Sequence, residues 1–600
     1  SDEVEMVKRG RSKSTARARK RIAGSLKSQA EEEEPYVEPL PFGREGNESL
    51  FAWADNDVIK GKAFFRRYYR LQRIVSKEDW DTFEDALFKP LPVTFRFSGA
   101  ADDAFRNHGE RLLVRLHNEG YAVRQLGPVD GWQLDGIDKH TLRRAEPGSS
   151  AAALRQWLIE GTDGGMLVRQ EVASMLPAAL AQVEPSHAVV DLCASPGSKT
   201  TQIVDSMVRQ ADGAPPSGVI VANDNDPVRA YTLVKRCFSA LGAATASVLV
   251  TCHDGQRFPR VAPADGGGGA DGTYDRIICD VPCTGDGTVR KNPEVFSRWE
   301  PELAFRMHEL QLQIAMRGIS LLRVGGRMMY STCSLNPIEN EAVVAELLRR
   351  SGGAIELEDG RAEANALIVE SAPGMSSWRV IDGNLFIHHN FDSARRSCGR
   401  SIGERRRFAP SMWPPAEGDA ALPLERCIRL FPHLSNTGGF FVALLRKRAP
   451  LSGPSPLWPR APHLPAPTAA DEAEGSRDGR GGATAERHRY RPIDRTLAKG
   501  LAAAFCRSAP SSATIKQLCA VLFVRSASAR RVVYMNGACG AHCGSPGLQV
   551  VHAGATVFVR QREPCGAAGD VADVGRVGGR SWRVTKEGKA VLATLLDVGE

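Results

Sequence analysis

Short apolar runs, each followed by polar or small residues, recur through the middle of the chain. They occupy residues 188–192, 218–222, 247–251, 276–279 and 327–330. Apolar runs of this length are typical of strands buried on both faces of a parallel sheet, and an amphipathic helix is expected after the first. The pattern therefore predicts an α/β fold. Because open α/β sheets bind ligands outside the carboxyl ends of their strands, the residues directly after each run are the candidates for chemistry.

Two cysteines follow the last two runs. Cys283 lies in Asp-Val-Pro-Cys-Thr-Gly-Asp-Gly-Thr at 280–288, and Cys333 lies in Ser-Thr-Cys-Ser-Leu-Asn-Pro at 331–337. Proline, glycine and polar residues surround both thiols. Two thiols in one crevice suit a reaction in which one attacks covalently and the other helps to end the covalent state, as in pyrimidine carbon-5 methylation. Three other cysteines are expected to be small buried hydrophobes: Cys237, Cys279 and Cys427.

The first three runs end in loops that suggest a site for a methyl donor. Gly197 allows backbone to approach a ligand closely, and the following helix start presents free N–H groups. Asp224, after the second run, is the expected acceptor for ribose hydroxyls, and Asp254, after the third, is placed to accept from an adenine amine. The predicted loop contacts are Cys193, Ala194, Ser195, Pro196, Gly197, Ser198 and Lys199.

Other interpretations of these loops stay open. Gly-Ser-Lys-Thr at 197–200 is similar to a phosphate-binding loop, but that motif needs adjacent Gly-Lys and a glycine where Leu192 stands. Cys193 is expected to be a loop packing residue, and each aspartate could be a turn or cap residue. Three acids after three successive strands nevertheless favour an adenosyl pocket.

At these motifs the chain resembles the Nop/Sun family of RNA cytosine-5 methyltransferases. The matching segments are 191–202, 280–292 and 330–341, with a lead-in at 91–96 and 169–177 and two final strands at 429–433 and 436–443. Residues 64–69 and 80–87 are similar to the eukaryotic branch that methylates transfer RNA. Thr284 stands where serine is usual, and Ser195 where alanine is usual. The resemblance implies a seven-stranded, Rossmann-like core that uses S-adenosylmethionine.

The resemblance also implies a role for each candidate residue. Cys333 is the expected nucleophile at carbon 6 of cytosine, and Cys283 is expected to help release the product. Asp280 is expected to bind the cytosine N3 and exocyclic amine and to belong to the donor site as well. Lys199 is expected to steady the base or the donor electrostatically. Arg290, Lys291 and Asn292 directly follow the motif and either contact the RNA backbone or the product, or form a solvated basic loop.

The sequence after Cys333 carries signals of a helix start. Asn336 is the predicted cap, Pro337 the first helical residue and Glu339 the partner in a capping box. A helix amino terminus so close to the thiol would lower the pKa of Cys333.

Composition narrows the class of protein. The chain has 600 residues, a net charge of +8 and 13 cysteines, and no apolar run approaches the roughly 18 residues of a membrane span. The odd cysteine count, without a secretion signal, indicates free thiols in a reducing compartment. The Cys-Gly-Ala-His-Cys segment at 539–543 has no second matching pair, so no metal is expected. Nine Lys and Arg with no acid between Lys8 and Lys27 suit RNA contact or nuclear import.

The composition also suggests five parts of the chain. They are a basic arm with an acidic run (1–45), a lead-in that binds RNA (46–165), a catalytic domain (166–446), a linker (447–490) and a PUA-like α+β domain (491–600). Loop insertions are expected at 391–425 and 265–272. Arg66, Arg67 and Arg70 lie among aromatics that could stack on bases or form core. We expect RNA, most of all transfer RNA, as partner of a monomer in the nucleus or nucleolus, with some cytoplasmic protein.

Two other functions are compatible with these features. A DNA cytosine-5 methyltransferase would use the cysteine of the Pro-Cys pair, Cys283, as its nucleophile and would not need Cys333. A catalytically idle RNA-binding assembly factor could also carry a basic arm and a PUA-like end. Consumption of the methyl donor with RNA or with DNA separates the three possibilities.

Overall fold

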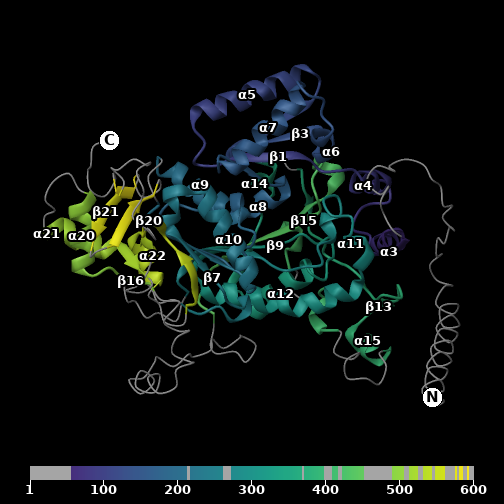
Figure 1. Ribbon diagram of the computed structural model, residues 1–600. Helices are drawn as coiled ribbons and strands as arrows, with labels where there is room; N and C mark the ends of the chain where they lie inside the picture. The colour runs from purple at the N-terminus through teal and green to yellow at the C-terminus, as the bar shows by residue number, and fades with distance from the viewer. Residues whose placement is uncertain are drawn as a thin grey trace, which may run out of the picture. The chain divides into compact units, whose positions relative to one another are not determined.

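The computed structural model (Figure 1) describes residues 56–212, 216–260, 272–367, 370–397, 408–416, 422–451, 490–505, 512–524, 531–543, 548–560, 574–577, 580–585, 589 and 591–592. The predicted basic arm, all but the last residue of the 265–272 insertion, and most of the predicted linker lie outside these residues.

A mixed ten-stranded sheet forms the centre of the chain. Its order is β11-β14-β15-β9-β8-β5-β6-β7-β19, and β10 also pairs with β15. The parallel strands are β5 (Ala188–Asp191), β6 (Val219–Asn223), β7 (Val248–Thr251), β8 (Tyr274–Asp280) and β9 (Leu322–Thr332). The five predicted strands and the α/β class are therefore confirmed, although the sheet holds more strands than the seven expected.

Both faces of this sheet are covered by helices (Figure 1). Val189 and Ile220 pack in one core with helices α8 (Val172–Leu180), α9 (Ser198–Gln210) and α10 (Pro227–Ala240). Val190 and Val221 pack in a second core with α12 (Pro301–Leu321) and α13 (Glu341–Ser351). Burial on both faces explains why these strands are continuous apolar runs rather than alternating ones.

Antiparallel strands extend the sheet beyond β9. They are β10 (Ile355–Glu358), β11 (Ala372–Pro373), β14 (Ile428–Leu430) and β15 (Phe440–Lys447). A separate pair, β12 (Val380–Ile381) and β13 (Ile387–His388), lies between them in the chain. Short helices connect these parts: α14 (Arg361–Ala366), α15 (Phe391–Ser397) and α17 (Pro432–Ser435). Helix α11 (Val295–Arg298) lies earlier in the chain, between β8 and α12. The insertion predicted as a loop at 391–425 thus begins with a helix.

The lead-in supplies three strands of a separate four-stranded antiparallel sheet, in the order β2-β3-β1-β4, and β4 lies just past residue 165. The strands are β1 (Pro92–Phe97), β2 (Ala122–Gln125), β3 (Gly131–Asp138) and β4 (Leu167–Arg169), with helices α5 (Asp103–Asn118), α6 (Lys139–Arg143) and α7 (Ser150–Asp163). Arg96 on β1 is buried and forms an ion pair with Asp205 on α9. It also donates to Gln170 and Thr201. This cluster fixes the lead-in sheet against the donor-loop helix.

The aromatic residues near Arg66 and Arg67 lie on helix α3 (Asn56–Gln72), which is followed by helix α4 (Trp80–Leu87). Phe65, Tyr68 and Tyr69 are at most 1% exposed, and the ring of Phe65 contacts Phe296 and Trp299. These aromatics are core residues, so they are not available to stack on bases.

The C-terminal region contains a six-stranded sheet in the order β16-β17-β18-β20-β22-β21. Its strands are β16 (Arg491–Pro492), β17 (Leu522–Val524), β18 (Arg531–Tyr534), β20 (Ala555–Arg560), β21 (Val574–Val577) and β22 (Arg580–Val584), with helices α20 (Arg495–Phe505), α21 (Ser512–Val521) and α22 (Gly537–Cys543). Strand β19 (Val550–Ala553) instead pairs antiparallel with β7 of the central sheet. Strand β17 begins at Leu522, directly after helix α21 ends at Val521.

Candidate active site

The two predicted cysteines meet at the carboxyl ends of neighbouring strands. Strands β8 and β9 are parallel, and Asp280 pairs with Ser331 in register. Cys283 follows the end of β8 by three residues and Cys333 directly follows the end of β9, so the two loops start side by side. The Sγ atoms of Cys283 and Cys333 are 3.2 Å apart, and both side chains are partly buried. The N–H of Gly287 donates to the carbonyl of Cys333 at 2.9 Å and fixes the two loops together.

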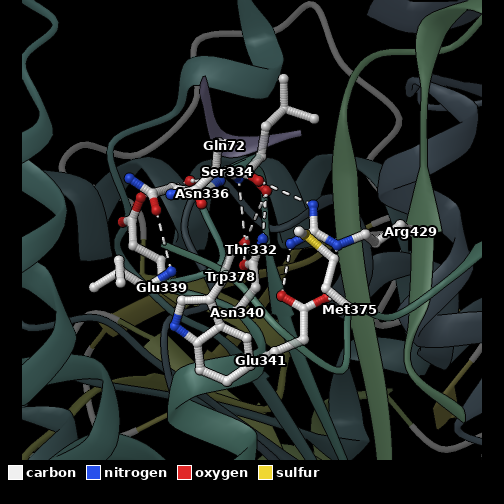
Figure 2. A network of polar contacts seen from close by, with 12 residues as sticks. Gln72, Thr332, Ser334, Asn336, Glu339, Asn340, Glu341, Met375, Trp378 and Arg429 are labelled. Atoms are coloured by element: carbon white, nitrogen blue, oxygen red, sulfur yellow. Dashed lines mark hydrogen bonds and ion pairs between the residues drawn. The ribbon is translucent and has the colours of Figure 1, made fainter. Parts of the chain in front are cut away.

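A buried carboxylate joins the same two loops. Glu339 has no exposed surface and accepts from Thr284 through both its N–H, at 2.9 Å, and its hydroxyl, at 2.6 Å. It also accepts from the hydroxyl of Ser334 at 2.5 Å and from Gln311 at 3.0 Å. Figure 2 shows this residue in the polar network around the loop after β9. Glu339 therefore positions the residue after Cys283 and the residue after Cys333 at once.

The helix predicted just after Cys333 begins later than expected. Helix α13 starts at Glu341, so Pro337 is not its first residue. The Asn336 N–H donates to Ser334 rather than to Glu339, and the amide oxygen of Asn336 accepts from Ile338. The capping box is wrong because four donors, three of them from other segments, occupy the Glu339 carboxylate. A helix terminus next to Cys333 cannot be used to explain thiolate formation there.

The two thiols differ in their electrostatics. The hydrogen bond with Cys333 and, next, burial raise the pKa of Cys283 well above its ordinary value of 9.0. Cys283 therefore keeps its proton near neutral pH and can donate it toward the Cys333 sulfur.

Lys199 and Asp280 form an ion pair beside the cysteines. The Lys199 ammonium lies 2.6 Å from Asp280 Oδ2 and 3.2 Å from the Ser174 hydroxyl. Burial disfavours the charged form of Lys199, but the carboxylate of Asp280 more than offsets this effect and raises the lysine pKa above 10.5. Asp280 Oδ1 accepts from the Ser331 hydroxyl at 2.6 Å. The carboxylate therefore links the donor loop to both cysteine-bearing strands.

The predicted donor loop lies between β5 and α9. Cys193, Ala194, Ser195, Pro196, Gly197 and Ser198 lead into Lys199, and Gly197 has φ 101°, a conformation that favours glycine. Burial raises the pKa of the Cys193 thiol, and this side chain packs against the core. Cys193 is thus a packing residue rather than a reactive thiol, as its neighbours in the sequence suggested.

The acids of the predicted pocket have different surroundings. Asp224 is 2% exposed, and its carboxylate accepts from the Asp226 N–H and lies 3.2 Å from the Arg229 guanidinium. Asp254 is exposed. Burial raises the pKa of Asp191 to about 7, and its Oδ1 has no hydrogen-bond partner among the described residues. An unsatisfied buried acceptor at the end of β5 fits a ligand that brings a donor to this edge of the sheet.

Two important residues were missed at the sequence level. Asn223 is fully buried; its amide donates to the carbonyls of Leu192 and His253 and accepts from the His253 N–H. It therefore ties together the loops after β5, β6 and β7. Asp286 is also fully buried and accepts from the Leu335 N–H at 2.7 Å. In the sequence both appear as ordinary polar residues at strand ends or in turns.

Arg290 fits neither of its two predicted roles. Its side chain is 3% exposed and donates to the carbonyls of Lys89, Pro90 and Thr437 and to the Asn436 side chain. Arg290 thus links the lead-in to the segment between β14 and β15 through these hydrogen bonds. The two residues after it, Lys291 and Asn292, are exposed.

Two properties of the described part of the chain bear on metal binding and membrane insertion. No group of three or more His, Cys, Asp or Glu side chains there could hold a metal ion. None of the described helices combines the length and the apolar character needed to cross a membrane.

Comparison with known proteins gives consistent matches. Residues 178–446 match the family described as 16S rRNA methyltransferase RsmB/F. A multisite-specific tRNA (cytosine-C5) methyltransferase of Schizosaccharomyces pombe is 37% identical over 67% of this chain and 61% of its own length. The Saccharomyces cerevisiae protein of the same description is 35% identical over 67% and 59%. A tRNA (cytosine(34)-C5) methyltransferase of Drosophila melanogaster is 36% identical over 66% and 54%. The chain thus spans less than two thirds of each relative.

Among solved structures, a methyltransferase homolog from Pyrococcus horikoshii is 23% identical over 65% of this chain and 98% of its own, with a TM-score of 0.41.

Proposed function

We propose that the chain is a member of the RsmB/F family of methyltransferases, which its residues 178–446 match, and that it methylates carbon 5 of cytosine in RNA, with transfer RNA as the substrate class. Members of this family depend on S-adenosylmethionine. The observation that carries the proposal is the pair of thiols 3.2 Å apart at the ends of adjacent parallel strands. A mechanism with two cysteines needs this arrangement, since one sulfur must depart from carbon 6 of the base while the neighbouring thiol assists its departure.

The donor would bind at the loops after β5, β6 and β7. The backbone of 193–198 and Lys199 would flank its methionine part, Asp224 its ribose and Asp254 its adenine, with Asp280 at the boundary with the base. Two features support a ligand site there. Asp191 Oδ1 has no hydrogen-bond partner among the described residues, and the side chain of Asn223 links all three loops by hydrogen bonds. When bound, the donor supplies an electrophilic methyl group.

Cys333 is the proposed nucleophile. Its sulfur forms a bond to carbon 6, the electrons of the 5,6 double bond move to carbon 5, and carbon 5 then bonds to the methyl carbon as the methyl–sulfur bond breaks. A proton on N3 would favour the addition, and Asp280 is the group placed to hold it there. Lys199 supports this role, because its ammonium and the Ser331 hydroxyl orient the Asp280 carboxylate.

Cys283 is the proposed release residue. For the adduct to break down, the proton on carbon 5 must pass to a base such as water, the electrons of that carbon–hydrogen bond must re-form the 5,6 double bond, and the Cys333 sulfur must depart as a thiolate with the electrons of its bond to carbon 6. A protonated Cys283 next to that sulfur can hydrogen-bond the departing thiolate. The raised pKa of Cys283 supports this division of roles.

Transfer RNA as the substrate rests on the relatives. The three proteins at 35–37% identity are described as tRNA (cytosine-C5) methyltransferases. The net charge of +8 also suits a polyanion.

We extend the proposal to the architecture. Strands β14, β15, β9, β8, β5, β6 and β7 are consecutive in the sheet and support a seven-stranded catalytic core within 166–446, to which β10, β11 and β19 are additions. We propose a lead-in that frames the RNA cleft, a linker at 447–490 and a PUA-like domain at 491–600. A monomer in the nucleus, which the basic arm would help to import, completes the proposal.

The test compares Cys283→Ala with Cys333→Ala, both incubated with bulk transfer RNA and S-adenosylmethionine and run on a denaturing gel. We expect Cys283→Ala to accumulate a covalent protein–RNA adduct, and Cys333→Ala to give neither adduct nor methyl transfer. The reverse pattern would assign the nucleophile to Cys283, as in a DNA cytosine-5 methyltransferase. If wild-type protein consumes no donor with any RNA, the idle RNA-binding factor becomes the better explanation.

A further inference from the structure

The C-terminal region contacts the loop that carries Asp254. Strand β19 pairs antiparallel with β7, with Val550 opposite Thr251. The pairing continues past the end of β7, because the Cys252 N–H donates to the Gln549 carbonyl at 3.2 Å. The Gln549 N–H in turn donates to His253 Nε2 at 2.8 Å. A segment almost 300 residues away in the sequence thus binds the two residues directly before Asp254.

The ring of His253 is suited to accept this hydrogen bond. Burial lowers the pKa of His253 to about 4, although the nearby carboxylate of Asp254 opposes the shift. The ring is therefore neutral near pH 7, and Nε2 can be an acceptor while Nδ1 carries the proton.

The same loop is held from its other side. Asn223 accepts from the His253 N–H at 2.9 Å and donates to the His253 carbonyl at 2.8 Å. The main chain of His253 is thus fixed by the pocket, and its side chain by Gln549 of the C-terminal region. Asp254 is exposed and directly follows His253, so the orientation of its side chain depends on these hydrogen bonds to His253.

The C-terminal region is itself firmly attached beside β7. Asn536 donates through its side chain to the carbonyls of Pro216 and Gly218 and to the Ser247 hydroxyl. Val550 and Ala553 are fully buried in a core shared with the central sheet. The hold on the Asp254 loop therefore comes from a rigid element.

We propose that the C-terminal region positions the Cys252-His253-Asp254 loop for adenosyl binding through the hydrogen bond from Gln549 to His253. Gln549 and His253 are positioning residues, and they act on the donor through Asp254. This inference rests on the proposed use of S-adenosylmethionine, but it assigns the C-terminal region a role in cofactor binding rather than only in RNA binding.

The experiment compares Gln549→Pro with Gln549→Ala in the full chain. Proline removes the N–H that reaches His253, whereas alanine keeps it and shortens only an exposed side chain. Titration calorimetry with S-adenosylmethionine should give a Kd about three- to tenfold higher for Gln549→Pro, as expected for one lost hydrogen bond, and an unchanged Kd for Gln549→Ala. The amides of 252–254 should exchange hydrogen faster in Gln549→Pro even without ligand.

A double-variant cycle with Asp254→Asn tests the route of the effect. If Gln549→Pro acts through Asp254, it should add almost no loss in the Asp254→Asn background. A Kd for Gln549→Pro equal to that of Gln549→Ala, or a full loss on top of Asp254→Asn, would overturn the proposal. Should Gln549→Pro fail to fold, His253→Ala removes the same acceptor and must show the same pattern. Wild-type protein that binds no donor would instead overturn the proposed function.

Discussion

Substitution of Glu339 by glutamine should change how stability depends on pH. Burial and, next, the charge of Asp286 raise the pKa of Glu339 from 4.5 to about 7. An acid whose pKa is raised on folding stabilises the folded state below its unfolded pKa, and this contribution is lost as the pH rises through its folded pKa. Between pH 5 and pH 8 the wild-type protein should lose about 2.5 kcal/mol from this group. Glutamine does not ionise, so Glu339→Gln should not show that loss.

The hydrogen bonds of Glu339 affect the comparison equally at both pH values. The amide group can still accept through one oxygen, and the hydroxyls of Thr284 and Ser334 can turn to accept from its nitrogen. Any cost of this rearrangement is present at pH 5 and at pH 8. The change in the stability difference between wild type and Glu339→Gln from pH 5 to pH 8 therefore reports only the ionisation of Glu339.

The assay is thermal unfolding of both proteins at pH 5 and pH 8. The melting temperature of Glu339→Gln minus that of wild type should rise by roughly 3 to 5 °C between the two pH values. Glu294→Gln, at an exposed position, should show a constant difference. If the Glu339→Gln difference also stays constant, Glu339 is ionised in the folded protein at pH 5 and the reasoning from its burial fails.

Two further predictions concern packing around the site. Gly287→Ala would place its Cβ 2.2 Å from the Gly439 carbonyl oxygen, so the loop of Cys283 must shift. We expect this variant to be destabilised by about 1–3 kcal/mol and to lose adduct formation. The control variant Gly537→Ala, whose Cβ would meet no described atom within 4 Å, should melt like wild type. Arg96→Met leaves buried Asp205 without its charge partner and should cost about 3–5 kcal/mol. The double variant Arg96→Met/Asp205→Leu should recover much of that loss in the same melting assay, and an equally unstable double variant would contradict the argument.

The strands that carry the chemistry could be predicted because burial leaves a local signal. The runs before Cys283 and Cys333 are apolar on both faces, and their ends are polar, so strand positions and the edge that binds ligands follow from the sequence alone. The distance of one loop from the next follows from parallel pairing, since equivalent strand ends lie at the same edge. This explains why a pair of thiols 50 residues apart could be expected in one crevice.

The polar residues that hold the loops gave no such signal. Glu339 has the spacing of a capping box, but two of its three partner residues, Gln311 and Thr284, come from segments more than 20 residues away. Asn223 lies between a strand and an aspartate and looks like a turn residue. Strand β19 is short, and its partner in the central sheet lies about 300 residues earlier. Tertiary partners decide these roles, and local patterns do not contain them.

Asp280 is the residue on which the separate parts of the site converge. It belongs to β8, its carboxylate accepts from Lys199 of the donor loop, and it also accepts from Ser331 at the end of β9. A carboxylate that is held from both sides cannot turn away when a base enters, so its direction toward the reacting ring is set before binding. Loss of the hydrogen bond from either Lys199 or Ser331 to Asp280 should therefore slow methyl transfer more than it weakens RNA binding. Ser331→Ala removes only a hydroxyl, and a lower kcat with little change in KM is the result that this geometry requires.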